Sequence, residues 1–219
     1  MSAAREFQKA LGSEVAKALA CDVEFVPSQL LLRWRGEGAD SLVSFSGSNK
    51  FSPFVSVAFY FGRRFESASQ IERAIGDRSN QWHISHYSIN LPLMMDMPYD
   101  GPHDWKVDIR NPPVTLVPEM ARAIQGMAYP FFERFASVLV ARDALLANDP
   151  WCVMADFMWS RMLSLDAALG ELEHYEEWSE KLPDFYRAHS DQAFDQVRNV
   201  LAQGIQQTAA RDRVKKRGA

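Results

Sequence analysis

Acidic residues and a histidine gather in one irregular, proline-rich stretch, residues 96–108. Carboxylates and an imidazole on one loop can converge as general acids and bases, or as ligands of a hard cation. The spacing matches no calcium-binding loop, and aspartates beside prolines also form solvated Asx turns. A plain surface loop is therefore the favoured interpretation, and a catalytic or cation site is the alternative. The residues concerned are Asp96, Asp100, His103, Asp104 and Asp108.

Two further histidines, His83 and His86, lie where the pattern predicts a strand. Residues three apart on a strand point to opposite faces, so the two imidazoles are poorly placed to share a metal ion. We predict no metal site, and no motif indicates a cofactor. The candidates for acid–base catalysis are His103, Asp104 and His86, in a small hydrolase-type enzyme.

The familiar motifs of catalysis are missing from the chain. It has no Gly-x-Ser-x-Gly nucleophile turn, no His-Glu-x-x-His zinc motif and no Gly-x-Gly-x-x-Gly dinucleotide motif. Residues 46–50, SGSNK, lack the spacing of a phosphate-binding loop and predict a hairpin loop instead. Neither Cys21 nor Cys152 has basic neighbours in the sequence that would activate its thiol. These absences favour a protein that binds over one that catalyses.

A protein-binding surface is indicated within residues 171–184. Six acidic residues accompany a single lysine there, and two aromatic residues stand among them. Aromatic anchors rimmed by charge are typical of protein interfaces, although acidic runs also simply face water. An acidic surface suits a basic partner such as a toxin domain. The predicted binding residues are Glu173, Tyr175, Glu176, Glu177 and Trp178.

The overall composition restricts the class of partner. The 219 residues carry a net charge of −4, and phosphate binding needs a concentrated basic face, so nucleic acid is disfavoured as the main partner. The basic tail, residues 211–219, is short and is predicted to fray. No stretch approaches the roughly 18 apolar residues of a membrane span, and the N-terminus does not resemble a signal peptide. Two cysteines fit a reducing compartment, so we expect a cytoplasmic protein.

The scaffold is predicted from periodicity. Residues 54–61, FVSVAFYF, read as the central strand of a sheet because they are dense in β-branched and aromatic side chains. An amphipathic helix over residues 3–20 precedes it, and helical patterns follow it. The other predicted strands are residues 23–26, 30–35, 42–45 and 82–91, with an edge strand at 105–109.

The C-terminal half is predicted to be helical. One helix starts near Pro118 and is kinked where Pro130 interrupts it, a long one runs over residues 151–172, and the last begins near Ser190. The chain is therefore predicted to be one α+β domain, residues 1–219, in which an antiparallel meander of about five strands is covered by helices. The sheet-rich part is 1–113, the helical part is 114–210 and the tail is 211–219.

The segments FVSVAFYFG, HISHYSINLP and VPEMARAIQGMAYPFFERF, behind an N-terminal helix, resemble small bacterial α+β proteins of unassigned function. Some of these are similar to immunity proteins, which neutralise toxins of competing bacteria. The resemblance lies in the order of elements and in the Pro-Phe-Phe-Glu segment, residues 130–133. It carries over no functional residue.

Three hypotheses about function follow. The leading one is a cytosolic, non-enzymatic protein that binds a protein partner, as an immunity protein binds a toxin. The second is a small hydrolase-type enzyme that uses the loop of residues 96–108. The third is a structural subunit of a larger assembly, with the last helix or a sheet edge as the docking surface.

Overall fold

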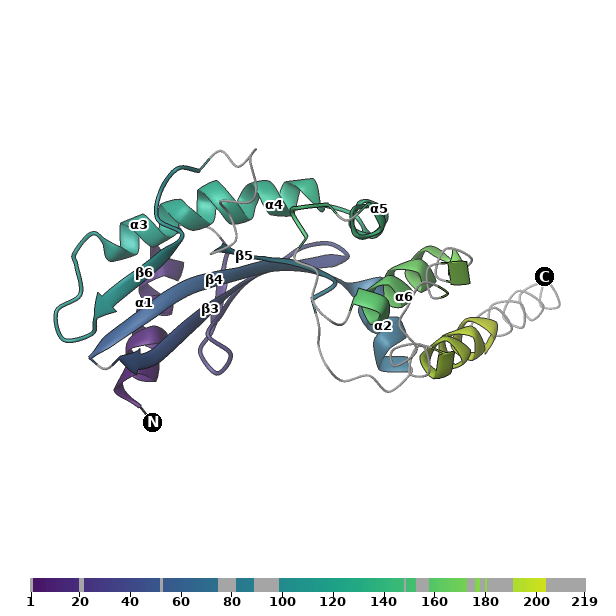
Figure 1. The fold of residues 1–219 in the computed structure, drawn as a ribbon, viewed down its shortest axis with the longest axis horizontal. Helices are drawn as coiled ribbons and strands as arrows, with labels where there is room; N and C mark the ends of the chain where they lie inside the picture. Colours follow the sequence, from purple (N-terminus) through teal and green to yellow (C-terminus); the bar gives the residue numbers. More distant parts are fainter. Residues whose placement is uncertain are drawn as a thin grey trace, which may run out of the picture. The chain divides into compact units, whose positions relative to one another are not determined.

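The structure is a computed structural model, and Figure 1 shows its fold. It describes residues 2–19, 22–51, 53–74, 82–88, 99–147, 149–152, 158–172, 176–177, 180 and 191–203. The chain separates into two compact units, which are described one at a time. The first comprises Met1–Phe65 and Trp82–Met154, and the second comprises Glu66–Gln81 and Ala155–Ala219. This grouping does not test the prediction of a single domain.

The first unit is built on a six-stranded antiparallel sheet. Its strands run in the order β1-β2-β3-β4-β5, and β6 pairs with the part of β4 that β5 leaves open. The predicted α+β class and the predicted meander are thus confirmed. The strands are β1 (Glu24–Val26), β2 (Leu31–Arg35), β3 (Ala39–Phe51), β4 (Phe54–Phe65), β5 (Ile84–Tyr87) and β6 (Asp104–Asp108).

Strand β4 is the centre of the sheet, as its composition predicts. Val55, Val57, Phe59 and Phe61 alternate along it and are almost completely buried beneath the helices. On the opposite face Tyr60 remains 40% exposed. Successive side chains of a strand point to opposite faces, so helices on one side produce this alternation.

Residues 46–50 do not form the predicted hairpin loop. Strand β3 continues through them, and Gly47 pairs with Val57 before the register shifts beyond Ser48. Ladder hydrogen bonds use the backbone alone, so small polar residues can extend a strand that periodicity ends. At Gly47 the end of the Gln8 side chain of the N-terminal helix lies where a Cβ atom would be, so a larger residue there would have to displace Gln8.

Helices cover one face of this sheet. Helix α1 (Ala3–Ala18) begins at Ser2, whose Oγ accepts a hydrogen bond from the Arg5 amide, and it packs beside α3. Helices α3 (Leu116–Ala123) and α4 (Tyr129–Arg134) run on along the sheet (Figure 1). The Phe131 ring meets Phe61 of β4 edge to face at 5.2 Å. These aromatic contacts hold the helices against the central strand.

A π-helical segment, η2 (Ile124–Ala128), joins α3 to α4. The amide of Tyr129 bonds to the carbonyl of Ile124, five residues back. Pro130 has no amide hydrogen and cannot donate the helical hydrogen bond of its position. The wider π turn lies just where the regular helix would lose this donor. The irregularity predicted at Pro130 therefore takes the form of a π turn just before it. Helix α5 (Val138–Leu146) follows, with the Ser137 side chain at its N-terminus.

The predicted helix over residues 151–172 is shorter in the described part of the chain. Helix α6 is Met158–Leu169, and Trp151 and Cys152 lie in a turn, not in a helix. The Asp149 carboxylate accepts the Trp151 amide at 2.8 Å. That contact closes a local Asx turn at the position where the sequence predicts the helix to begin. Residues 153–157 lie outside the described chain.

In the second unit, α6 packs against α2 (Glu66–Ala74). The Ser164 hydroxyl donates to the buried Glu72 carboxylate at 3.1 Å. Residues 191–203 are helical, as predicted. Among the described residues, no helix has the length and apolar character needed to cross a membrane.

Candidate functional site

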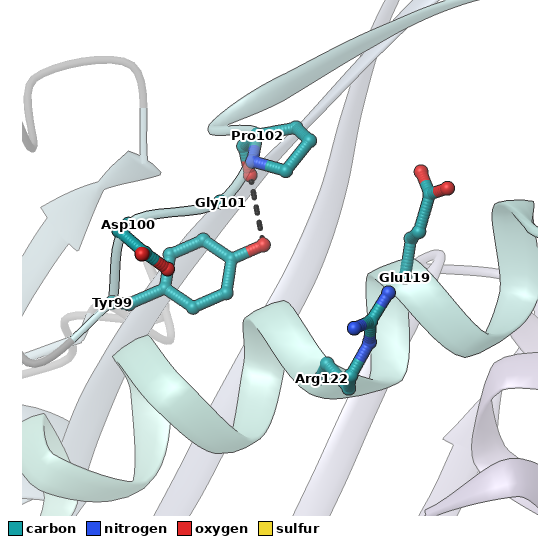
Figure 2. A pocket seen from close by; sticks show the side chains of 6 residues that line it. All are labelled: Tyr99, Asp100, Gly101, Pro102, Glu119 and Arg122. Atoms are coloured by element: carbon teal, nitrogen blue, oxygen red, sulfur yellow. Dashed lines mark hydrogen bonds between the residues drawn. The ribbon is translucent and has the colours of Figure 1, made fainter.

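A pocket of about 480 Å³ opens in the first unit between residues 99–102 and helix α3 (Figure 2). Its volume lies within the usual range of sites for small molecules or inserted side chains. The loop supplies one wall, and the surface of α3 supplies the other. The lining residues are Tyr99, Asp100, Gly101, Pro102, Glu119 and Arg122.

The loop wall is fixed to the central strand through Ser88. The hydroxyl of this fully buried residue accepts the Phe59 amide at 3.0 Å and donates to the His103 carbonyl at 2.6 Å. Strand β6 begins one residue later, at Asp104. The C-terminal end of the pocket loop is thus tied directly to β4.

Tyr99 fits into this wall because two glycines give it room. A Cβ atom on Gly126, in the π-helical segment, would lie 2.6 Å from the Tyr99 ring, and one on Gly101 would meet the Tyr99 hydroxyl. That hydroxyl donates to the Pro102 carbonyl at 3.3 Å. Single π turns inside helices are frequent at functional sites, and this one places Gly126 against the aromatic wall of the pocket.

Three charged groups surround the Tyr99 phenol. Burial raises the pKa of Tyr99, the Arg122 cation partly opposes that shift, and the carboxylates of Glu119 and Asp100 add to it. The hydroxyl therefore stays protonated near neutral pH and can donate a hydrogen bond.

The charged side chains of the pocket have no partner among the residues that the structure describes. Within the described chain, Asp100, Glu119 and Arg122 form no ion pair or hydrogen bond through their side chains. Pairs at the same three-residue spacing do form on α1, where Lys17 meets Glu14 at 2.6 Å. The pocket therefore offers a guanidinium donor and two carboxylate acceptors to a ligand.

His103 supports the pocket from behind. It does not line the cavity, and its ring meets the Tyr99 ring edge to face at 6.2 Å. Its Nδ1 atom is buried without a hydrogen-bond partner among the described residues. The side chain thus packs against Tyr99 and keeps one unused polar atom.

The other predicted catalytic groups lie elsewhere. His86 is 2% exposed on the helix-covered face of the sheet, beside Phe61. Burial lowers the pKa of His86 to about 4, partly opposed by the Trp151 backbone, and neither ring nitrogen has a hydrogen bond of ordinary length within the described chain. Asp104 is exposed on the opposite face of the sheet. His103, Asp104 and His86 are therefore not brought together.

Other members of the acidic loop are also dispersed. Asp108 forms a salt bridge with Arg110 at 2.7 Å, and its hydrogen bonds from Arg110 lower the pKa of Asp108 to about 2. Asp96 lies outside the described residues. His83 is buried, and its Nδ1 accepts the Phe65 amide at 2.8 Å. No cluster of three or more metal-binding side chains occurs in the described part of the chain.

The predicted protein-binding residues are only partly described. Glu176 and Glu177 are helical and exposed. The remaining three, Glu173, Tyr175 and Trp178, fall outside the described residues. A binding role for this acidic segment stays a prediction.

Sequence reasoning named Asp100 but missed Tyr99, Glu119 and Arg122. One signal pointed to them: Gly126 interrupts a strongly helical pattern, and a glycine inside a helix often marks a close approach.

Comparison of the chain with protein-family models, curated proteins and solved structures gives no match.

Proposed function

We propose that this chain is a non-enzymatic protein that acts by binding a basic protein partner, in the manner of an immunity protein that neutralises a toxin. The observation that carries the proposal is the pocket beside α3, where a half-buried phenol and three charges without a partner in the described chain surround one cavity. A concave site with a few convergent polar groups is suited to recognition.

The distribution of titratable groups favours binding over catalysis. General acid–base catalysis needs a titrating group within hydrogen-bond reach of the reacting atoms. In this chain His86 is buried in the sheet and Asp104 faces away from the helices, while the pocket walls carry fixed charges and a protonated phenol. Those groups can orient a ligand without reacting with it.

Charge indicates the nature of the partner. The pocket holds two carboxylates against one guanidinium, and the exposed Glu176 and Glu177 of the second unit add further negative charge. Complementary potentials speed association and reject partners of the wrong sign. A cytoplasmic location is part of the proposal, since Cys21 and Cys152 would there remain thiols.

The test has two stages. The tagged chain is expressed in its native host, the captured protein is identified, and both proteins are then purified for calorimetry. We expect a direct complex, and we expect co-expression of the chain to relieve the toxicity of the partner. A purified partner that does not bind, or that stays fully toxic, would overturn the proposal.

Charge-reversal variants test which surface of the chain contacts the partner. Glu119→Lys in the pocket, or Glu176→Lys with Glu177→Lys in the second unit, should weaken binding of a basic partner by about tenfold or more. The matched control is Glu133→Lys, because Glu133 is exposed on α4 and does not line the pocket. Loss of binding in the control alone would place the interface elsewhere.

A hydrolase remains the second candidate, and one observation favours it. The unpartnered Nδ1 of His103 lies beside Tyr99, which lines the pocket, so a small shift of the loop would bring an imidazole to the cavity. The test is hydrolysis of a panel of chromogenic carboxylic and phosphate esters. This alternative requires a rate that falls at least roughly a hundredfold in His103→Ala. Equal rates in the two proteins would exclude it.

A further inference from the structure

The charged side chains of the pocket differ in sign and therefore pair with different groups on a ligand. Glu119 is half-buried, and Arg122 and Asp100 are exposed, yet none of them has a partner in the described chain. A ligand that carries only a cation would satisfy the carboxylates and leave the Arg122 guanidinium without a partner. A ligand that carries only an anion would do the reverse. Unpaired charge near a closing interface is costly, so a ligand with both charges is favoured.

The spacing of these groups sets the separation of charge in the ligand. Glu119 and Arg122 stand one turn apart on the same face of α3, and residues at that spacing have Cβ atoms roughly 5–6 Å apart. Asp100 and the Tyr99 hydroxyl extend from the opposite wall (Figure 2). A cation and a carboxylate separated by several ångströms would match this arrangement.

We propose that the pocket receives the C-terminal residue of the protein partner, a basic residue whose side-chain cation pairs with Glu119 while its terminal carboxylate pairs with Arg122. This inference rests on the proposed function, because it names the part of the partner that is recognised. An arginine suits the site well, since its planar guanidinium can donate two parallel hydrogen bonds to the Glu119 carboxylate.

Capture of a chain end also fits the construction of the pocket. The Tyr99 wall is held by Ser88 and by the π-helical segment, so the site is formed before a ligand arrives. A preorganised site loses little conformational freedom on binding and can select a short terminal group.

Four small probes test the proposal on the full-length chain. Nα-acetyl-L-arginine carries both the cation and the carboxylate of a chain end. Nα-acetyl-L-citrulline has the same shape without the cation, and Nα-acetyl-L-arginine amide lacks the carboxylate. Free L-arginine represents the alternative source of the same chemistry, because it adds an α-ammonium that a chain end lacks. Binding is measured by ligand-observed NMR and calorimetry at low ionic strength.

We expect Nα-acetyl-L-arginine to bind most tightly, and each of the two acetylated analogues to bind roughly tenfold more weakly, as for loss of one charge-assisted hydrogen bond. Equal affinity for these three probes, or no measurable binding of any probe, would overturn the inference. Free L-arginine binding more than tenfold more tightly than its acetylated form would also overturn it, because the site would then take a free amino acid.

Two variants assign the contacts. Glu119→Gln should abolish the preference for arginine over citrulline, and Arg122→Gln should abolish the preference for the carboxylate over the amide. Glu133→Gln is the control, and thermal unfolding confirms that each variant is folded. Variants that weaken all probes equally would contradict the assigned contacts.

The experiments distinguish failure of this inference from failure of the proposed function. If a purified partner binds the full chain and still binds after removal of its C-terminal residue, the proposed function stands and this inference fails. If no partner binds, the proposed function fails whatever the probes do.

Discussion

At the scale of the residue, His86 combines complete burial with two ring nitrogens that find no hydrogen bond of ordinary length in the described chain. An imidazole in apolar surroundings is tolerated when neutral and is destabilising when charged. The ring packs against Phe61, a fully buried residue of β4. Protonation of His86 would therefore place a positive charge in the buried interior of the first unit, next to β4.

The folded-state pKa of His86, about 4, lies below the ordinary 6.5, so the unfolded chain binds this proton more readily. The free energy of unfolding should thus be intact above pH 6.5 and should fall by up to about 3 kcal/mol as pH drops towards 4. Urea unfolding at pH 7, 5.5 and 4.5 measures this fall. His86→Phe should show a smaller fall, and parallel profiles for the two proteins would refute the prediction.

At the scale of the element, the π-helical segment changes the register of the helix so that it fits the neighbouring loop, residues 99–102. A regular helix through Ile124–Ala128 would change which residues face residues 99–102. In the observed geometry Gly126 faces Tyr99 and gives the ring its place. The element thereby links the helix register to the shape of the pocket.

This link predicts a coupling between Gly126 and Tyr99. Gly126→Ala should lower the free energy of unfolding by about 1–3 kcal/mol, because the new Cβ atom meets the ring. In a Tyr99→Ala background the same change should be neutral or stabilising by up to about 1 kcal/mol, since alanine is the better helix former. A double-mutant cycle in urea measures the coupling. Additive effects would show that the ring moves aside at no cost.

At the scale of the whole molecule, both units contain almost completely buried apolar side chains. Phe61 is buried in the sheet of the first unit, and Leu163 is buried on α6 of the second. If the chain is one cooperative domain, as its sequence predicts, damage to either core lowers a single unfolding transition.

We expect Phe61→Ala to cost about 3–5 kcal/mol and Leu163→Ala about 2–5 kcal/mol, through lost packing and the cavities left behind. Calorimetry should show one transition shifted by either substitution. Val114→Ala, at a side chain that is 94% exposed, is the control and should leave it unchanged. Two transitions, each moved by one substitution only, would show that the units unfold independently.

The elements were more predictable than the site, for a physical reason. The density of β-branched and aromatic side chains along residues 54–61 identified β4 from the sequence, and the helical period identified α1 and α3. The pocket depends on contacts between distant residues. Tyr99 and Arg122 line the same pocket only because the sheet, the π turn and the buried Ser88 position the loop. No local sequence pattern encodes that combination.

Strand β4 shares one edge between two partners, β5 along residues 60–63 and β6 along residues 54–58. Ser88 and His103 are joined by a hydrogen bond at the junction. The end of the β5 region and the start of β6 are therefore held together beside β4. Because Ser88 and His103 are anchored, a change in the sequence or length of the connection between them should have little effect on strand pairing. It is therefore the position at which we would exchange or insert sequence while keeping the sheet intact.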